Sequence, residues 1–412
     1  MKLSRIFILA LLVVIAFEAV AQNDSILVTD KDTVAYRYTP MAVSVPVKRT
    51  AWQRFVNYMV ESELDRSFEK GVDMTFAPAI YYSPSTSAGL AVMAAGLYRF
   101  DKENRNISPS NFSLYGAVSL TGFYRVGAKG LNIFRNDNRR LSYNVEFFSQ
   151  PTSFWGVGYD AAMTNSAMQY LASRVCVNMR FSQRVAKGLF VGVGADYNYH
   201  FGKFGGKKYA SEEDFLARLD GERVVYNATG VSLFVEFDTR DVVSNPHRGV
   251  YVGIQAKVRP KGMNNIGRTL WSGRLSANYY QKLWKGALLA FDLRAELNSE
   301  GTPWVYNASI GGISAMRGYY GGRFNDLCAV TLQAELRQKI YKGFGAAAWG
   351  GAGNVFSSFK SFDWHETLPT YGIGLRYEVK RNLNVRLDYG FGSRDYHGKL
   401  IHGALFSLNE AF

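Results

Sequence analysis

Cysteine and histidine are scarce in this chain, which limits the chemistry it can support. Among 412 residues there are two cysteines, Cys176 and Cys328, and five histidines. Two cysteines so far apart provide no disulfide framework, so we interpret both as free thiols without a catalytic role. The histidines are scattered and lack the H-E-x-x-H spacing typical of zinc enzymes. We therefore expect no metal and no cofactor.

Long apolar runs are also missing after the N-terminus. No stretch there approaches the ~18 apolar residues that indicate a membrane-spanning helix. The exception is the beginning of the chain, where Lys2 and Arg5 precede an apolar core over 6–17 and the triplet AVA at 19–21. This order predicts a secretory signal peptide over residues 1–21, with an uncleaved membrane anchor as the alternative.

What the chain does contain is a repeated alternation of apolar and polar residues, together with 40 glycines, 26 tyrosines and 28 phenylalanines. In residues 250–259, apolar side chains at even positions alternate with polar or small ones at odd positions. Successive side chains of a strand face opposite sides, so one face suits lipid and the other water. Such stretches run to the about 9–11 residues that cross a bilayer at a tilt, whereas soluble strands average about 5–6. The pattern predicts an all-β fold, a transmembrane antiparallel β-barrel over residues 72–412.

About sixteen such strands can be placed along the chain. An even number returns both ends of the barrel to the periplasm, as bacterial barrels require. The part from 112 to 135, divided here into two strands, could instead be one long strand. The predicted strands are 72–82, 88–100, 112–124, 128–135, 139–149, 168–184, 188–200, 224–239, 248–259, 267–283, 286–298, 327–340, 343–354, 369–380, 383–391 and 404–412.

The connections between these strands are of two kinds. Short turns occur at 187–188, 285–286, 342–343 and 380–382. Outer-membrane barrels have short periplasmic turns and longer extracellular loops. We therefore predict that the long connections lie outside the cell, at 201–223, 299–326, 355–368 and 392–403.

Residues 22–71 form a polar segment with one amphipathic stretch. Its apolar residues recur at three- and four-residue spacing, which predicts a short periplasmic helix. The helix could pack against the barrel rim, or it could enter and plug the lumen. The apolar positions are Trp52, Phe55, Val56, Met59, Val60 and Leu64.

The formal net charge of the chain is +14. Such an excess of cations can indicate nucleic-acid binding. Here the cations are spread through strands and turns of a chain that we expect to be exported, so we exclude nucleic acid. The charge favours outer-membrane lipids and lipopolysaccharide as partners, together with a positively charged lumen.

The most specific motif is GGISAMRGYY over 311–320, in the long connection before residue 327. Other stretches are FDTRD at 237–241 followed by NPHRG at 245–249, and GAGNVF at 351–356. With GIGLR at 372–376 and RLDYG at 386–390, these motifs resemble, in order, those of the BamA/TamA family, also called the bacterial surface antigen family. The resemblance covers most of residues 72–412. It implies a barrel in the outer membrane of a Gram-negative bacterium.

In that family the loop with the arginine-glycine-aromatic element folds back into the lumen, and its arginine pairs with inward acidic side chains. The resemblance assigns this anchoring role to Arg317, Gly318 and Tyr319, and it matches Glu335 to one acidic partner. A guanidinium in a confined lumen needs a carboxylate that can accept two hydrogen bonds, and such a pair would hold the loop.

The chain departs from the family at the expected second partner. Where the family usually has Asp before Ala-Gly-Asn, this chain has Gly351. The second acidic partner is therefore missing, or it is supplied by Asp388 or Glu236.

Two further sets of residues follow from the resemblance. The last predicted strand resembles the C-terminal signal by which outer-membrane proteins are recognised for insertion, with Phe406, Leu408 and Phe412 on one face and Glu410 as the exception. The turn near residue 240 resembles a motif of the family and would be periplasmic. Its residues are Asp238, Arg240, Asp241, Pro246, Arg248 and Gly249.

Family members that insert or secrete proteins carry POTRA domains ahead of the barrel. The stretch from 22 to 71 is too short for one, so we expect a relative without POTRA domains. The resemblance implies a protein that assists insertion or assembly of outer-membrane components, with other outer-membrane proteins as clients or accessory subunits. The alternative is an outer-membrane channel or a structural barrel.

An enzymatic function is disfavoured. Inward carboxylates such as Glu236 and Asp238 could be catalytic in principle, because barrel enzymes exist. Salt bridges with Arg240, Lys257 and Arg259 are the favoured interpretation of these carboxylates. No phosphate-binding glycine loop or nucleophile elbow occurs.

Overall fold

The computed structural model describes residues 67, 71–83, 87–101, 107 and 109–412, except for positions 207, 220, 242–244, 342, 381–382, 409 and 411. The predicted signal peptide and the predicted amphipathic helix lie outside these residues. Within the described residues, no helix has the length and apolar character needed to cross a membrane.

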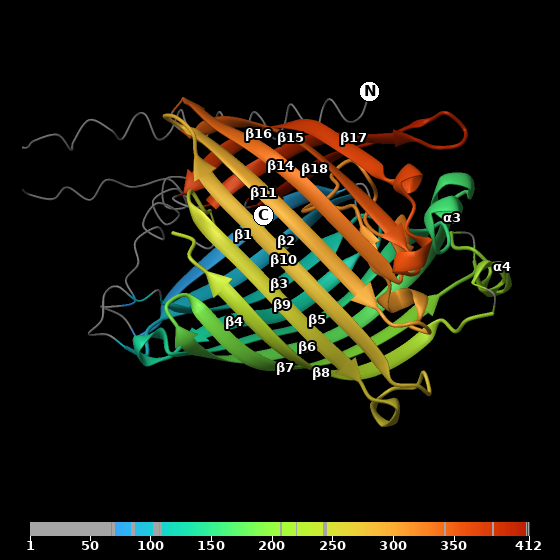
Figure 1. Cartoon of the computed structure of the whole chain (residues 1–412), viewed down its shortest axis with the longest axis horizontal. Coiled ribbons are helices and arrows are strands. Elements are labelled where there is room, and N and C mark those ends of the chain that lie inside the picture. Colours follow the sequence, from blue (N-terminus) through green and yellow to red (C-terminus); the bar gives the residue numbers. More distant parts are fainter. Residues whose placement is uncertain are drawn as a thin grey trace, which may run out of the picture. The chain divides into compact units, whose positions relative to one another are not determined.

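Sixteen strands of the described chain form one antiparallel sheet, in which each strand pairs with the next strand of that sheet along the chain. The strands wrap around a common lumen at a tilt (Figure 1). They are β1 Asp73–Ser83, β2 Ser87–Tyr98, β3 Ser110–Ser119, β4 Tyr124–Ile133, β5 Arg139–Phe154, β6 Met168–Ala186, β7 Leu189–Lys203, β8 Val225–Asp238, β9 Gly249–Arg259, β10 Leu270–Lys282, β11 Ala287–Asn298, β14 Cys328–Tyr341, β15 Phe344–Phe356, β16 Leu368–Lys380, β17 Leu383–Arg394 and β18 Leu400–Leu408.

The two faces of the strands have the polarity of a membrane barrel. On β14, Leu332 is 55% exposed, while its neighbour Gln333 and the inward Glu335 are 1% and 0% exposed. On β8, Leu233 is exposed and Ser232 is buried. Apolar side chains outside and polar ones inside reverse the arrangement of a soluble protein, because the outer surface faces hydrocarbon.

The prediction of about sixteen antiparallel strands is confirmed, with errors at several ends. Residues 112–135 form two strands, but the turn between β3 and β4 lies at 120–123, earlier than predicted. Strand β5 continues to Phe154 because Pro151 does not end it; Pro151 pairs with Leu171 across the β5–β6 ladder. Strand β5 is therefore longer than the bilayer-spanning stretch that the alternation of apolar and polar residues predicts.

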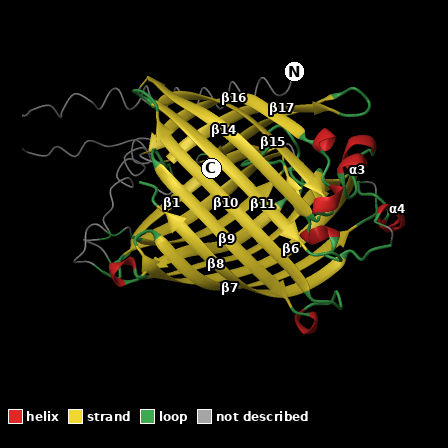
Figure 2. Cartoon of the chain, viewed as in Figure 1, coloured by secondary structure: helices red, strands yellow, loops and turns green. Residues whose placement is uncertain are grey.

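The long connections carry short elements that have no strong periodicity in the sequence. Helices α3 (Tyr159–Thr164) and α4 (Glu212–Arg218) gather at one end of the barrel with most 3-10 turns, and short turns lie at the other end (Figure 2). Strands β12 (Ala308–Ile310) and β13 (Phe324–Asp326) form a separate two-stranded sheet in the connection between β11 and β14. The 3-10 turns are η1 Arg135–Asp137, η2 Lys261–Met263, η3 Trp304–Tyr306, η4 Phe359–Ser361 and η5 Trp364–Glu366.

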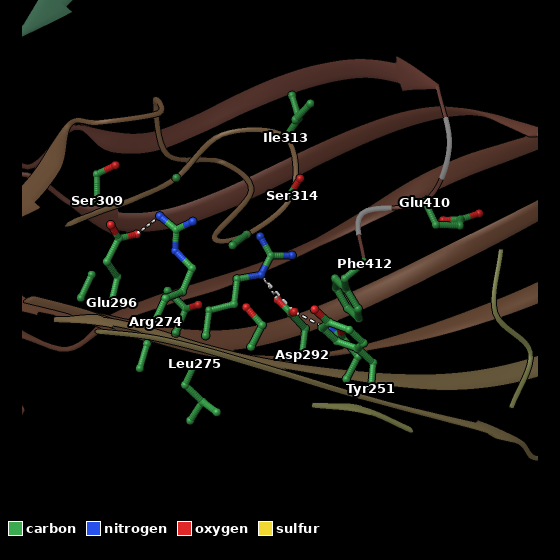
Figure 3. Close-up of a pocket in the computed structure, with 18 of the residues that line it drawn as sticks. Tyr251, Arg274, Leu275, Asp292, Glu296, Ser309, Ile313, Ser314, Glu410 and Phe412 are labelled. Atoms are coloured by element: carbon green, nitrogen blue, oxygen red, sulfur yellow. Dashed lines mark hydrogen bonds and ion pairs between the residues drawn. The ribbon is translucent and has the colours of Figure 1, made fainter. Parts of the chain in front are cut away.

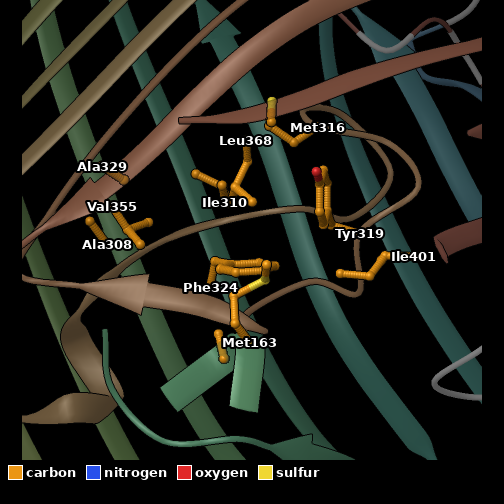
Figure 4. Close-up of a cluster of buried hydrophobic side chains, with 11 residues drawn as sticks. Met163, Ala308, Ile310, Met316, Tyr319, Phe324, Ala329, Val355, Leu368 and Ile401 are labelled. Atoms are coloured by element: carbon orange, nitrogen blue, oxygen red, sulfur yellow. The ribbon is translucent and has the colours of Figure 1, made fainter. Parts of the chain in front are cut away.

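A compact apolar cluster fills part of the lumen. It joins the β11–β14 connection to α3 and to the inner faces of β14 to β18 (Figure 4). An apolar core inside a polar lumen stabilises a loop that would otherwise be solvated. Its buried members are Ala162, Met163, Ala308, Ile310, Met316, Tyr319, Phe324, Ala329, Val355, Leu368 and Ile401.

The sheet begins with β1 and ends with β18, and these two strands lie in contact. Among the described residues, no ladder of paired residues joins them. We call this junction the seam.

The end of the chain differs from the prediction. Strand β18 ends at Leu408, after Phe406 pairs with Leu387 in the ladder. Glu410 and Phe412 then turn into the lumen: Glu410 contacts two arginines, and Phe412 packs beside a buried cluster of Tyr280, Leu288 and Ala290. The prediction that Phe412 shares the face of Phe406 is wrong, because inward arginines attract Glu410 and draw the last residues off the wall.

Candidate functional site

The connection between β11 and β14, residues 299–327, folds into the barrel and presents its motif to the inner face of β14 to β18. We call these residues the lumen loop. Arg317 is completely buried, and Tyr319 is 2% exposed. Met316, directly before the arginine, has a positive φ of 49°, which is uncommon for a side chain of its size. The motif is thus held in an unusual backbone conformation by its surroundings.

A row of residues in register forms the surface on which the motif lies. Glu335 pairs with Trp349, Trp349 with Gly372, Gly372 with Gly390 and Gly390 with Gly403, across β14 to β18. We call Gly372, Gly390 and Gly403 the glycine row. The Trp349 ring covers Gly372 so closely that a Cβ there would lie 2.4 Å from the ring. The row therefore gives the loop backbone a flat surface.

The loop backbone approaches this surface too closely for any side chain. A Cβ at Gly390 would lie 2.4 Å from the carbonyl oxygen of Arg317. Gly318 has a φ of +112° and would place a Cβ 2.8 Å from the carbonyl carbon of Gly390. Both positions require glycine, one for space and one for space and conformation.

The Arg317 guanidinium has three partners on the wall. Its Nη2 lies 2.5 Å from Glu335 Oε2, and its Nη1 lies 2.8 Å from Asp388 Oδ2. The guanidinium carbon lies 3.7 Å from the centre of the Trp349 ring. Two charge-assisted contacts and a cation–π contact fix the fork on both sides. Asp388 thus occupies the place of the second acidic partner that Gly351 cannot supply.

Three more arginines surround the same carboxylates. Arg337 Nε lies 2.6 Å from Glu335 Oε1, and Arg376 Nη1 lies 2.6 Å from Asp388 Oδ1. Arg386 Nη1 lies 3.2 Å from Asp388 Oδ2, and Arg376 Nε lies 2.9 Å from Glu410 Oε2.

Together these residues make an ion-pair cluster of four arginines and three carboxylates, with a formal charge of +1. Each carboxylate contacts at least two arginines, which offsets the cost of burying the charges. Its members are Arg317, Arg337, Arg376, Arg386, Glu335, Asp388 and Glu410.

Neutral contacts hold the motif on either side of Arg317. The Thr370 hydroxyl donates to the Arg317 carbonyl oxygen at 2.7 Å. The Tyr319 hydroxyl donates to the Pro369 carbonyl at 2.7 Å and accepts from the Ser393 N–H at 2.7 Å. Burial raises the pKa of Tyr319, so its hydroxyl remains a donor at physiological pH.

The far side of the lumen loop contacts the connection between β5 and β6. The Tyr320 ring lies 5.3 Å from the Trp155 ring, and the Gly158 N–H donates to the Asn325 carbonyl at 2.8 Å. Arg323 Nε donates to the Ala162 carbonyl at 3.1 Å. The loop is therefore held between the α3 connection and the C-terminal strands.

Glu236 does not belong to the cluster, contrary to one of the alternatives. It pairs with Arg180 at 2.8 Å and accepts from the Tyr251 hydroxyl at 3.0 Å. Its strand, β8, lies four positions before β14 in the sheet order, so it faces a different part of the lumen. Asp238 pairs with Arg240 at 2.8 Å, as the salt-bridge interpretation suggests.

The other two cations named as partners of Glu236 and Asp238 have a different carboxylate. Lys257 Nζ lies 2.5 Å from Asp196 Oδ1, and Arg259 Nη2 lies 3.6 Å from Asp196 Oδ2. Asp196 lies on β7 at an inward position, which the alternation of that strand could have indicated.

The turn between β8 and β9 is built by the predicted motif residues. Asp241 Oδ1 accepts from the N–H groups of His247 and Arg248 at 2.9 and 3.3 Å. Gly249 has a φ of +112°, and a Cβ there would lie 2.5 Å from the Thr239 carbonyl oxygen. Pro246 is buried at the same turn. These contacts make the motif a turn-forming unit.

Other sequence-based expectations concern chemistry. Cys176 and Cys328 are free thiols in the structure. In the part of the chain that the structure describes, no three His, Cys, Asp or Glu side chains gather in a way that could hold a metal ion.

Arg337, Arg376, Arg386 and Glu410 were not anticipated as members of the site. Strand alternation could have indicated two of them. Arg337 is two residues from Glu335, and Arg386 is two residues from Asp388, so each shares an inward face with a predicted partner. The glycine row was hidden because its register across strands cannot be obtained from single strands.

A lipid-facing barrel with an arginine-anchored loop in its lumen defines a class, the outer-membrane barrels of Gram-negative bacteria that carry such a loop. A family model described as the Omp85 superfamily domain matches residues 131–412. The chain belongs to the Omp85 superfamily, and the resemblance to BamA and TamA is confirmed. None of the curated proteins compared with the chain matches it.

Solved structures share the fold. BamA from Haemophilus ducreyi lacking POTRA domains 1–3 has a TM-score of 0.56 at 12% identity, over 82% of this chain and 70% of that one. CdiB from Escherichia coli has a TM-score of 0.57 at 11% identity, over 82% of this chain and 63% of that one. CdiB from Acinetobacter baumannii has a TM-score of 0.51 at 14% identity, over 83% and 60%. The chain thus spans less than two thirds of either CdiB.

Proposed function

We propose that the protein assists insertion or assembly of outer-membrane components, and that the seam between β1 and β18 is the working element. The observation that carries this proposal is the sheet order, which begins at β1 and ends at β18 without a described ladder between them. A poorly paired strand edge offers backbone donors and acceptors to an incoming strand.

The lumen loop would support this function by holding one side of the seam in shape. Its motif contacts β14 to β18, including the glycines of the two strands nearest the seam, Gly390 on β17 and Gly403 on β18. In this proposal Arg317, Gly318 and Tyr319 keep the C-terminal side of the barrel rigid, so that opening is confined to the seam. Clients and accessory subunits would be other outer-membrane proteins.

Depletion of the protein, followed by a quantitative proteome of the outer membrane, tests this function. Selective loss of other barrels supports assembly. Unchanged barrel levels with altered solute uptake would contradict assembly and support the second candidate, a channel, which the two lumen cavities of about 690 and 500 Å³ favour.

A crosslink tests the role of the seam. Cysteine pairs placed across β1 and β18 should abolish complementation of the depleted strain when oxidised, and reduction should restore it. The matched control is a pair at Val193 and Leu233, which oppose each other in the β7–β8 ladder and face outward. If the seam crosslinks leave complementation intact, the seam is not the working element.

A further inference from the structure

Two cavities lie against the inner wall of the barrel, and they differ in charge. The first, of about 690 Å³, is lined by three arginines and three carboxylates (Figure 3). Its charges are paired: Arg274 lies 3.0 Å from Glu296, and Arg294 lies 3.0 Å from Asp292. We call it the Asp292 cavity.

The second cavity, of about 500 Å³, has more cations than anions. Arg174, Lys257, Arg259 and Arg274 line it with only two carboxylates, Asp196 and Glu296. Arg274 pairs with Glu296, and Lys257 and Arg259 both contact Asp196, so no carboxylate of the lining is left for Arg174. We call it the Arg174 cavity. Its wall carries a formal excess of +2, which creates a positive potential in a confined space.

The cations of the Arg174 cavity also have unused hydrogen-bond donors. Arg259 is 9% exposed, and its one carboxylate contact within the described part of the chain, to Asp196, is long at 3.6 Å. Arg174 Nη2 donates to the main-chain carbonyl of Val305 at 3.2 Å. The buried Nε atoms of Arg174 and Arg259 have no hydrogen-bond partner among the described residues. A buried guanidinium donor without a partner is costly, and a bound anion would remove that cost.

Neutral donors and a lumen-loop residue complete the lining. Asn178, Asn198 and Ser272 add amide and hydroxyl groups. The Arg259 guanidinium lies 5.0 Å from the centre of the Tyr306 ring, and the Tyr306 hydroxyl donates to the Asn198 carbonyl at 3.3 Å. The cavity thus lies between the strands and η3 of the lumen loop, partly screened from bulk water.

We propose that the Arg174 cavity binds a tetrahedral oxyanion of the phosphate class, with Arg174 and Arg259 as the principal ligands and Lys257 as a supporting charge. Arginine forks match the geometry of phosphate oxygens and supply charge-assisted hydrogen bonds. The Asp292 cavity, where carboxylates match the arginines, lacks this capacity. The inference is independent of the proposed role of the seam.

The test measures thermal unfolding of the purified full-length protein in detergent while inorganic phosphate replaces chloride at constant ionic strength. Phosphate should raise the unfolding midpoint of wild type saturably, because a ligand that binds the folded state stabilises it. Arg174→Gln should weaken the apparent phosphate affinity by about tenfold or more, since one charge-assisted contact is lost. Glutamine removes the charge and keeps a polar amide at this position of β6.

Two other variants keep the test decisive. Arg259→Gln should weaken phosphate binding as Arg174→Gln does, and it serves if Arg174→Gln fails to fold. Arg294→Gln, which removes one charge from the Asp292 cavity, should retain the wild-type response. The proposal would be overturned if chloride stabilised the wild type as much as phosphate does, or if the wild type did not respond to phosphate. It would also be overturned if Arg294→Gln lost the phosphate response to the same extent as Arg174→Gln.

A further arm separates the two sources of such an anion. Micelles that contain a short-chain anionic phospholipid are compared with inorganic phosphate. Stabilisation by the phospholipid alone, dependent on Arg174, identifies a lipid headgroup as the ligand. Stabilisation by inorganic phosphate identifies a soluble phosphate. Absence of an Arg174-dependent effect with either probe contradicts the site.

Discussion

On the C-terminal wall of the lumen, formed by β14 to β18, Glu335 and Asp388 each contact three arginines. On the wall formed by β6 to β11, Arg174 donates to a main-chain carbonyl and has no carboxylate contact among the described residues, and Arg259 shares Asp196 with Lys257. The lumen loop packs on the first wall, and the Arg174 cavity lies against the second. Charges on a filled wall stabilise one geometry, whereas charges beside a cavity remain available to a ligand.

The comparison separates two uses of arginine in one barrel. Where each carboxylate contacts at least two arginines and the loop backbone packs on glycine, the structure resists change. Where an arginine lacks a carboxylate contact and borders a cavity, its substitution should affect binding more than stability. The unfolding free energy of single variants in detergent measures this difference between the two walls.

Glu335→Gln should have the largest effect. It leaves four arginines facing two carboxylates, which raises the formal charge of the cluster from +1 to +2. Leaving buried charge uncompensated typically costs about 3–5 kcal/mol. Denaturant unfolding measures the loss, and the double variant Arg317→Ala with Glu335→Gln should recover part of it. A double variant less stable than Glu335→Gln by the full cost of Arg317→Ala would show that the two residues are not coupled.

Arg317→Ala should cost less, about 2–3 kcal/mol, from the lost charged hydrogen bond to Asp388, the lost ion pair with Glu335 and the lost contact with Trp349. Its carboxylates keep other arginines, so no buried anion is left alone. Arg317→Lys should rescue poorly, because an ammonium cannot bridge Glu335 and Asp388 as a fork does. Full rescue by lysine would contradict the geometric part of this account.

Gly390→Ala should destabilise by about 1–2 kcal/mol, because its methyl group would overlap the Arg317 carbonyl and push the loop off the wall. Gly350→Ala on β15 is the matched control, since a Cβ there meets no atom within 4 Å. Equal unfolding free energies for the two alanine variants would show that the loop does not pack on the glycine row.

Arg294→Gln should have the smallest effect, less than about 1 kcal/mol, as expected for a partly exposed pair. Asp292 would keep hydrogen bonds from the amides of Asn278 and Gln333, at 2.7 and 2.9 Å. The same denaturant series measures this variant. A loss as large as that of Glu335→Gln would remove the distinction between the two walls.

The sequence indicates the barrel because alternation over many strands depends only on which side of the sheet each residue faces. The same alternation fails at Glu410 and Phe412, where the ion-pair cluster overrides the continuation of β18. The motif identifies Arg317, and Glu335 follows from the resemblance. The choice between Asp388 and Glu236 needs the sheet register, which brings β17 beside the loop and leaves β8 elsewhere.

The short elements of the lumen loop and of the β5–β6 connection could not be predicted from the sequence, for a different physical reason. Strands β12 and β13 have three residues each, and helix α3 has six, so none shows a period. Their positions depend on the apolar cluster that they form with β14 to β18, around Phe324 and Tyr319. Such packing depends on residues far apart in the sequence and is set only by the complete fold.

Protease cleavage on intact cells shows whether the ion-pair cluster holds the lumen loop on the C-terminal wall. Cleavage within residues 299–326 is followed over time for wild type, Arg317→Ala, Glu335→Gln and the control Arg294→Gln. Wild type and Arg294→Gln should resist, and the other two variants should be cut faster. Cleavage of all four at the same rate would show that the cluster does not hold the loop.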